Sequence, residues 1–232
     1  MKAAVIIPVF NERESLPLVV GDIPRDLVSA VLVVDNGSTD GTDLVAGMLG
    51  VRLVRETRRG YGSACLAGLA ALEPDPPDVV VFLDGDYSDH PEEMPSLLAA
   101  IRLGADLVIG SRTLGAREPG ALAPQARLGN FFACFLIRVL QGHRYTDLGP
   151  FRAIRWEACR RLDMRDRDFG WTCEMQVKAV RDGLRIAEVP VSYRRRVGVS
   201  KITGTLSGTL RAGWKILWTI ARYGLLNARR KE

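Results

Sequence analysis

The chain has 232 residues, of which 47% are hydrophobic and 25% charged, and this composition excludes a disordered, collagen-like or coiled-coil protein. The net charge of +5 is unevenly distributed: residues 1–126 carry 10 Lys and Arg against 18 Asp and Glu, whereas residues 127–232 carry 22 against 9. The four cysteines show no C-x-x-C spacing, which predicts reduced thiols and a cytoplasmic protein. No apolar run approaches the ~18 residues of a transmembrane helix, so none is expected.

Short, nearly all-apolar runs alternate with segments of helical spacing through the first half of the chain. Such runs are typical of strands that are buried on both faces of a parallel sheet. The alternation predicts an α/β protein with a mostly parallel central sheet between two layers of helices, and ligands of such sheets bind at the carboxyl ends of the strands. The expected strands are 3–7, 30–34, 51–54, 79–83 and 106–109, and the expected helices are approximately 13–20, 41–49, 62–72 and 92–103.

Polar residues follow three of these strands directly, at residues 8–12, 35–42 and 84–91. Each loop alone could consist of turn residues and helix caps, because Asn-Gly, Asp-Gly and Ser-Thr-Asp are common in turns and at helix N-termini. Three acidic loops at the same edge of one sheet instead favour a binding site.

The most informative loop is Asp84-Gly85-Asp86, where an apolar strand ends in two carboxylates separated by one glycine. Carboxylates this close repel each other unless a cation lies between them. Mg²⁺ or Mn²⁺ suits such oxygen ligands and is typically bound by one or two carboxylates together with substrate phosphates. We therefore expect Asp84 and Asp86 to bind the cation of a metal-bound diphosphate. Asp89 is expected to cap the following helix, and His90 to be structural or exposed.

Seven short segments over about residues 4–205 form a recognisable set. They are 7–12 (IPVFNE), 34–42 (VDNGSTDGT), 60–64 (GYGSA), 84–86 (DGD), 110–112 (GSR), 147–152 (DLGPFR) and 195–201 (RRVGVSK). The first, second and fourth resemble the nucleotide-sugar site of family 2 glycosyltransferases, and the others resemble the polyprenyl-phosphate sugar transferases of the dolichyl-phosphate mannose synthase group. The resemblance implies a glycosyltransferase A type, nucleotide-sugar-binding fold for a catalytic domain at 1–205. An amphipathic basic segment is expected at 206–232 from its own residues.

The resemblance also implies roles for individual positions. Phe10, Asn36 and Ser88 depart from the group, which often has Tyr, Asp and Gln there, and this leaves the nucleotide and the metal ligands open. A cation and guanidinium groups would stabilise the charge that develops on a departing diphosphate. The implied roles are base and ribose binding for Pro8, Phe10, Glu12 and Asp35; metal and diphosphate binding for Asp84, Gly85 and Asp86; and phosphate binding for Arg112, Arg195 and Lys201, which with Asp86 are the candidate catalytic residues.

The nature of the acceptor is inferred from an absence. A hydroxyl acceptor needs a general base, which in family 2 is commonly an Asp in a Glu-Asp pair, and the corresponding region, 169–174, has no such pair. A phosphate acceptor needs no base because it is already an anion, with a second pKa near about 6. We therefore expect inverting transfer of a hexose, from a donor of the GDP-mannose or UDP-glucose type, to a polyprenyl phosphate. Arg127 and Asp147 are expected on the acceptor side. A hydroxyl acceptor with Glu174 as base is the alternative.

Two segments, 206–226 and 128–140, predict contact with a membrane surface. The second is rich in phenylalanine, and the first carries three cations within about 40° of one another at 100° per residue, flanked by two tryptophans. This pattern is typical of helices that lie in the membrane interface. A packed core helix or a dimer face is the alternative for each segment. The cations are Arg211, Lys215 and Arg222, and the tryptophans are Trp214 and Trp218.

Three other classes of protein fit less well. Residues 60–64 lack the third glycine and the acidic residue of a dinucleotide-binding turn. A sugar nucleotidyltransferase usually has a Gly-rich, Arg-containing loop after its first strand, and this chain does not. A nucleic-acid-binding module is disfavoured because Trp and Leu interleave with the cations of 193–231 and the acidic loops would repel a phosphate backbone. The expected enzyme is peripheral on the cytoplasmic face of a membrane, held by its own helices or by a membrane-spanning partner.

Overall fold

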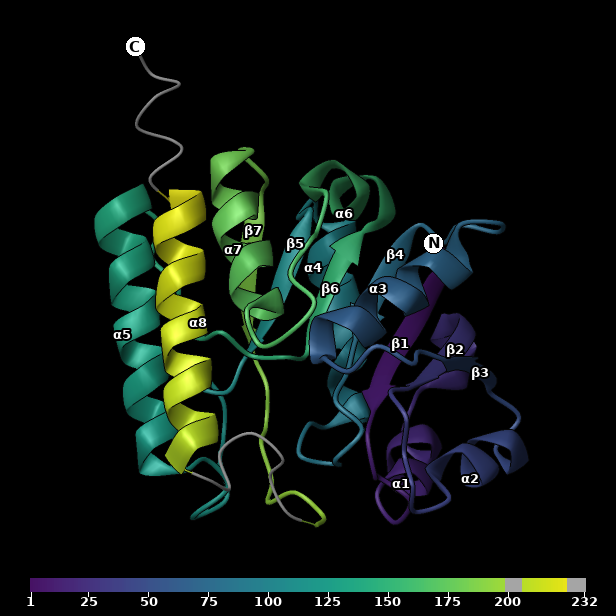
Figure 1. Ribbon diagram of the computed structural model, residues 1–232. Coiled ribbons are helices and arrows are strands. Elements are labelled where there is room, and N and C mark those ends of the chain that lie inside the picture. Colours follow the sequence, from purple (N-terminus) through teal and green to yellow (C-terminus); the bar gives the residue numbers. More distant parts are fainter. Residues whose placement is uncertain (199–205, 225–232) are drawn as a thin grey trace.

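The structure is a computed structural model and describes residues 1–198 and 206–224 (Figure 1). Within these residues one seven-stranded sheet has the strand order β3-β2-β1-β4-β6-β5-β7. The strands are β1 Ala3–Val9, β2 Val28–Asp35, β3 Arg52–Arg55, β4 Val79–Phe82, β5 Leu107–Ser111, β6 Arg152–Arg155 and β7 Ile186–Pro190. The helices are α1 Leu16–Gly21, α2 Thr42–Met48, α3 Tyr61–Leu72, α4 Met94–Arg102, α5 Pro124–Gln141, α6 Trp156–Leu162, α7 Trp171–Arg181 and α8 Leu206–Gly224, with short 3₁₀ turns at Arg25–Leu27 and Pro91–Glu93.

The sheet is parallel except at one strand. β1 pairs in parallel with β2 and β4, β2 with β3, and β5 with β7, whereas β6 runs antiparallel to both of its neighbours, β4 and β5. The five expected strands are confirmed, and β6 and β7 are additional. β6 has an arginine at each end and β7 contains a glutamate, so neither is an uninterrupted apolar run and the sequence pattern does not reveal them.

Both faces of the sheet are covered, as a parallel sheet requires. Along β1 the residues alternate between two cores: Ala4 and Ile6 belong to one, and Ala3, Val5 and Ile7 to the other. Helices α3, α5, α7 and α8 contribute to the first core and α1, α2 and α4 to the second. The three-layer arrangement is therefore confirmed. All four cysteines are buried.

Helices α5, α7 and α8 lie side by side at one end of the sheet (Figure 1). α5 and α8 correspond to the helical segments expected at 128–140 and 206–226, and α8 packs against α7 as well as α5. Lys201 lies outside the described residues, and the division of the chain at residue 205 stays a prediction. In the part of the chain that the structure describes, no helix combines the length and the hydropathy needed to cross a membrane.

Candidate active site

A cavity of about 490 Å³ lies at the carboxyl edge of the sheet, and we call it the donor cavity. The ends of β1, β2 and β4 reach it from one side, and the loop before α7 reaches it from the other. Gly85 is required where the β1 and β4 loops meet, because a Cβ there would lie 2.6 Å from Val9 Cγ1. The lining residues are Pro8, Val9, Phe10, Glu12, Asn36, Arg59, Gly60, Tyr61, Ala64, Asp84, Gly85, Asp86, Asp168, Phe169 and Arg196.

The two carboxylates Asp84 and Asp86 both face this cavity, and each is held by neighbours. The Tyr61 hydroxyl donates to Asp84 Oδ1 at 3.0 Å. Asp86 Oδ1 accepts from the backbone N–H and the hydroxyl of Ser88, and its Oδ2 lies 2.8 Å from a guanidinium nitrogen of Arg196. Burial and the charge of Asp86 raise the pKa of Asp84 to about 6. A cation bound between the two carboxylates would offset both the burial of their charge and their mutual repulsion.

A divalent cation fits this pair of carboxylates. No cluster of three or more acidic, His or Cys side chains with metal-binding geometry occurs within residues 1–198 and 206–224. Mg²⁺ and Mn²⁺ do not need such a cluster when a substrate supplies phosphate oxygens. The guanidinium of Arg196 supplies positive charge to Asp86, and an incoming cation would replace this ion pair. Asp84 and Asp86 would hold the metal, and the diphosphate would complete its ligands.

A third carboxylate, Asp89, is enclosed nearby. Its side chain is 1% exposed, and neither of its oxygens has a hydrogen-bond partner among the described residues. Burial and the charges of Asp84 and Asp86 raise its pKa well above the ordinary value. The expectation that Asp89 caps the next helix is wrong: the 3₁₀ turn begins after His90 and has no side-chain cap. Asp89 instead stands in an isolated bridge with Tyr193 and ties the β4 loop to the segment that carries Arg196.

A flat, cationic surface borders the donor cavity beside the β1 loop. The Arg59 guanidinium lies 3.8 Å from the centre of the Phe10 ring, and its nitrogen donates to the backbone carbonyl of Asn36. The Asn36 amide in turn holds the 56–60 loop through Glu56, Arg58 and Gly60. Such a stacked pair is suited to a planar base. These contacts give Asn36 a structural role in shaping the 56–60 loop.

Of the other residues predicted at the base and ribose pocket, two line the donor cavity and one does not. Pro8 and Glu12 line the donor cavity, and Glu12 Oε2 accepts a hydrogen bond from Ser15. Asp35 is buried, 6% exposed, and accepts from the backbone N–H of Ser38; it does not line the cavity. Asp35 therefore shapes the turn after β2 rather than presenting its carboxylate to the cavity.

Neighbouring arginines of the segment 193–196 have different surroundings. Arg195 Nε donates to the carbonyl of Pro119 at 2.7 Å, and its backbone N–H donates to Glu118, so its side chain lies away from the donor cavity. The next residue, Arg196, reaches Asp86 and lines the cavity. The sequence predicted phosphate binding by Arg195, whereas the arginine that lines the cavity is Arg196. The run of three arginines at 194–196 does not reveal which one points inward.

Arg112 and Asp147 form a buried pair with three contacts. Arg112 donates from its backbone N–H and Nε to one carboxylate oxygen at 2.8 Å each, and from its terminal nitrogen to the other at 2.7 Å. Asp147 is 1% exposed. The positive charge of Arg112 also acts on Asp84 and Asp89. The sequence predicted that Arg112 binds the donor phosphate and that Asp147 lies on the acceptor side. In the structure the two side chains instead form one ion pair.

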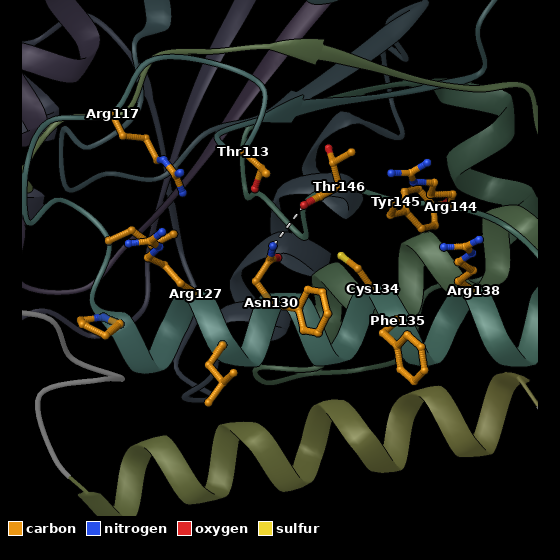
Figure 2. A pocket seen from close by; sticks show the side chains of 14 residues that line it. Thr113, Arg117, Arg127, Asn130, Cys134, Phe135, Arg138, Arg144, Tyr145 and Thr146 are labelled. Carbon is orange, nitrogen blue, oxygen red and sulfur yellow. Dashed lines mark hydrogen bonds between the residues drawn. The ribbon is translucent and has the colours of Figure 1, made fainter.

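A second cavity, of about 610 Å³, runs along α5, and we call it the arginine groove (Figure 2). Thr146 connects it to the Arg112–Asp147 pair, because it precedes Asp147 and its hydroxyl lies 2.7 Å from that of Ser111. Asn130 of α5 donates to the Thr146 carbonyl across the groove, as Figure 2 shows. Arg127, which the sequence predicts on the acceptor side, lines this groove, and its role stays a prediction. The lining residues are Thr113, Arg117, Leu122, Pro124, Arg127, Leu128, Asn130, Phe131, Cys134, Phe135, Arg138, Arg144, Tyr145 and Thr146.

Glu174 is not placed to act as a base. Its side chain is fully buried and lies 2.6 Å from Lys178 Nζ in an ion pair. Its carboxylate also accepts the backbone N–H groups of Arg165 and Asp166, and it lines neither cavity. A carboxylate with these partners is structural, and the alternative that assigned it to deprotonate a hydroxyl is wrong.

Helices α5 and α8 both expose aromatic side chains. Phe131, Phe132 and Phe135 are at least half exposed on α5, and Trp214 and Trp218 are exposed by 71% and 52% on α8. The basic stripe expected on α8 is corrected at one position. Lys215 Nζ lies 3.0 Å from Asp166 Oδ2, so it faces the protein and not a lipid surface. Arg222 is exposed, and the side chain of Arg211 lies outside the described residues.

The donor-cavity residues that the sequence did not assign to the site include Arg59, Tyr61, Asp168, Phe169 and Arg196. Tyr61 lies within the 60–64 motif, so its position could have been inferred from that motif. The others come from loops outside the strand ends or, for Arg196, from the neighbour of an expected residue. Asp168 is also a carboxyl with a raised pKa, because of burial and the charge of Asp166.

The fold and the strand-end carboxylates define the protein as a glycosyltransferase of the A type. The chain belongs to glycosyl transferase family 2, whose model matches residues 4–163. It is 34% identical to the undecaprenyl-phosphate mannosyltransferase of Micrococcus luteus over 97% of this chain and 95% of that protein. It is 35% identical to the polyprenol monophosphomannose synthase of Mycolicibacterium smegmatis, over 88% and 82% of the two chains.

Solved structures show the same fold. The glucosyl-3-phosphoglycerate synthase from Mycobacterium tuberculosis, in complex with Mn²⁺, UDP-glucose and phosphoglyceric acid, superposes with a TM-score of 0.76 at 24% identity. The match covers 96% of this chain and 79% of that one. At this identity the likeness concerns the fold alone.

Proposed function

We propose that this protein is a divalent-metal-dependent, inverting glycosyltransferase that moves a hexose from a nucleotide sugar to a polyprenyl phosphate at the cytoplasmic surface of a membrane. One observation carries the proposal. The chain has both an acidic cavity suited to a metal-bound diphosphate and a groove lined by four arginines. The buried Arg112–Asp147 pair lies near both, because the charge of Arg112 acts on Asp84 and Asp147 follows Thr146 of the groove. The first cavity suits a nucleotide-sugar donor and the second an anionic acceptor.

The donor would be oriented by the residues around the first cavity. Phe10 and Arg59 present a flat, cationic face to the base, and Asp84 and Asp86 would hold the cation with the diphosphate. When bound, the cation supplies positive charge that stabilises the leaving nucleoside diphosphate. Arg196, released from Asp86 by the exchange of partners, can donate two parallel hydrogen bonds to a phosphate, which suits its planar guanidinium.

The acceptor phosphate would bind in the arginine groove. Arg127 and the three other arginines there face no acidic lining residue, so the groove attracts an anion. A phosphate oxygen attacks the anomeric carbon as the bond to the donor diphosphate breaks, which inverts the configuration. No proton is removed from the acceptor, and the burial of Glu174 is consistent with a reaction that needs no base.

Membrane contact would come from the helices beside the groove. Phe131 and Phe135 line the groove and are also exposed, so an apolar chain could leave it along α5. The exposed tryptophans of α8 have the amphipathic rings that favour the headgroup region. The names of the relatives in Micrococcus luteus and Mycolicibacterium smegmatis, which specify undecaprenyl phosphate and polyprenol monophosphomannose, support the same acceptor class.

The test is direct. Purified protein is incubated with GDP-mannose, UDP-glucose and other nucleotide sugars, with undecaprenyl phosphate in vesicles and with Mg²⁺, Mn²⁺ or chelator. We expect one donor to give an acid-labile glycosyl lipid phosphate that extracts into organic solvent and whose formation stops with chelator. The same donors are offered with sugar hydroxyl acceptors. Transfer to a hydroxyl but not to the lipid phosphate would overturn the proposed acceptor, and equal transfer in chelator would overturn the metal.

A further inference from the structure

The loop at residues 165–170, which we call the wall loop, forms part of the donor cavity although it lies far from the strand-end motifs in sequence. Asp168 and Phe169 contribute side chains to the cavity lining. The loop has no regular secondary structure over most of its length, so its shape depends on hydrogen bonds made by individual side chains. Whatever holds the wall loop therefore also shapes the donor cavity.

On its inner side the wall loop packs directly against the start of α3. Ser63 donates its backbone N–H to the carbonyl of Arg167 at 2.9 Å, and its hydroxyl donates to the same carbonyl. A Cβ at Gly62 would lie 2.1 Å from the carbonyl oxygen of Asp166, so only glycine allows this approach. The neighbouring Tyr61 holds the carboxylate of Asp84. A displacement of the wall loop would thus move the first turn of α3 and, through Tyr61, disturb the carboxylate of Asp84.

Asp166 is the central anchor of the wall loop. Its Oδ1 accepts the backbone N–H groups of Asp168 and Gly170, and its own backbone N–H donates to Glu174. Its Oδ2 lies 3.0 Å from Lys215 Nζ of α8. Asp166 is 9% exposed, so its charge is poorly solvated and depends on these partners. One carboxylate therefore fixes the loop internally and connects it to the last described helix.

A second contact of α8 with the wall loop lies one turn further along the helix. Thr219 is 1% exposed, and a Cβ at Gly170 would lie 2.7 Å from its hydroxyl oxygen. Lys215 and Thr219 are separated by four residues and so lie on the same side of α8. On other positions of the helix, Trp214, Leu217 and Trp218 are exposed. α8 therefore contacts the wall loop with one side and presents apolar side chains to the surroundings with another.

We infer that Lys215 is a positioning residue that couples docking of α8 on a membrane surface to binding of the nucleotide in the donor cavity. This inference rests on the proposed membrane-surface function and adds a link between membrane binding and nucleotide binding. A bilayer that takes up the exposed aromatic side chains of both α5 and α8 favours the arrangement in which the two helices are packed, and in that arrangement Lys215 reaches Asp166. Because coupling between two binding events is reciprocal, a bound nucleotide also strengthens the attachment of the protein to vesicles.

The experiment measures the affinity of the full-length protein for GDP and UDP with Mn²⁺, by calorimetry, with and without vesicles that contain anionic lipid. In the wild type we expect vesicles to tighten binding of the preferred nucleotide at least about fivefold, the lower end of typical coupling. Lys215→Met should weaken nucleotide binding without vesicles several-fold and abolish the increment that vesicles give. Lys215→Arg, which can keep the ion pair, should restore both.

The control is Arg222→Gln, which removes the same charge from an exposed position on α8. Any loss of attraction to anionic lipid is common to both variants, so a difference in nucleotide affinity isolates the Lys215–Asp166 contact. The double variant Asp166→Asn with Lys215→Met should bind nucleotide no more weakly than either single variant, because each substitution removes the same ion pair. Equal nucleotide affinity for wild type and Lys215→Met under both conditions, or fully additive losses, would overturn the inference.

Failure of the proposed function would look different. A wild-type protein that binds nucleotide but neither vesicles nor lipid acceptor would contradict the proposed membrane reaction and with it the coupling. A wild type that glycosylates lipid phosphate in vesicles, with a nucleotide affinity that vesicles do not change, would leave the function intact and overturn the coupling alone.

Discussion

The donor cavity and the arginine groove use charge in opposite ways. In the donor cavity the charged side chains already have partners: Tyr61 donates to Asp84, and Arg196 pairs with Asp86. In the groove, Arg117, Arg127, Arg138 and Arg144 form no ion pair with any residue of the described ranges. The donor cavity therefore has to exchange internal partners for a ligand, whereas the groove only gains them.

This difference has a consequence for each substrate. Exchange of partners makes donor binding depend on the geometry of a few side chains, because a carboxylate left without a cation in a poorly solvated site is costly. Attraction of an anion to several exposed arginines is additive and weakened by salt. Substitutions in the donor cavity should accordingly have large and specific effects, and those in the groove should have smaller effects on the KM for the acceptor.

The largest effect is expected from Asp86→Asn. The substitution removes the charge that attracts the cation and leaves Arg196 without its ion-pair partner. We expect kcat/KM to fall at least about 10³-fold and Mn²⁺ binding, followed by electron paramagnetic resonance with nucleotide present, to disappear. Asp43→Asn removes a carboxylate that pairs with Arg55 on the surface and should change neither quantity. Retention of Mn²⁺ binding by Asp86→Asn would contradict the assigned metal site.

Adjacent arginines give the next contrast. Arg196→Gln removes the guanidinium that lines the donor cavity and should lower kcat/KM about 10²-fold, the cost typical of losing one group that stabilises developing charge. Arg195→Gln removes a side chain that binds the carbonyl of Pro119 outside the cavity and should change kcat/KM less than about threefold. Initial rates at varied donor concentration separate the two. A larger loss for Arg195→Gln than for Arg196→Gln would support Arg195 as the phosphate-binding residue, as the sequence predicts.

The arginine pair also shows where sequence reasoning ends. The carboxylates Asp84 and Asp86 could be located because a strand that is buried on both faces directs the residues after it to the carboxyl edge of the sheet. Arg195 and Arg196 lie in an extended segment whose register is set by distant contacts, including the bridge of Asp89 with Tyr193. A run of three arginines contains no alternation that would reveal this register.

Helix α8 illustrates the same limit in a helix. Its helical spacing predicted a helix over 206–226, and the structure has α8 at Leu206–Gly224. The position of Lys215 depended on a partner 49 positions earlier, Asp166, in a loop that has no periodicity. The antiparallel strand β6 escaped prediction for a related reason, since its place between β4 and β5 is decided by pairing and not by an apolar run.

A smaller effect is expected in the groove. Arg127→Gln should raise the KM for the lipid acceptor about tenfold, which is the loss of one charged hydrogen bond, and leave the KM for the donor unchanged. Raising the salt concentration should raise the acceptor KM of the wild type more than that of the variant, because one screened charge is missing. Arg102→Gln, at the exposed end of α4, is the matched control. A change in the donor KM for Arg127→Gln would mean that the groove and the donor cavity are not separate sites.

The smallest effect is expected on stability, where Asp84→Asn should stabilise the fold although it removes a carboxylate proposed to bind the metal. The pKa of Asp84 in the folded protein is about 6, above its ordinary value of 3.8, so its ionisation opposes folding as the pH rises through this interval. Without metal, Asp84→Asn should therefore raise the free energy of unfolding by about 1–3 kcal/mol at pH 7.5, and the gain should diminish toward pH 4, where the wild-type carboxyl is protonated in the folded state. The amide oxygen that the substitution introduces would still accept a hydrogen bond from Tyr61.

Urea unfolding at pH 7.5 and at pH 4 measures this difference, with Asp26→Asn as the exposed control that should show none. Mn²⁺ with nucleotide should stabilise the wild type and not Asp84→Asn, because the carboxylate that destabilises the empty cavity is the one that binds the cation. Identical pH dependence of the two proteins would mean that Asp84 is well solvated and that the donor cavity is not under electrostatic strain. In that case the contrast with the groove would rest on the Arg196–Asp86 ion pair alone, which donor binding would still have to exchange.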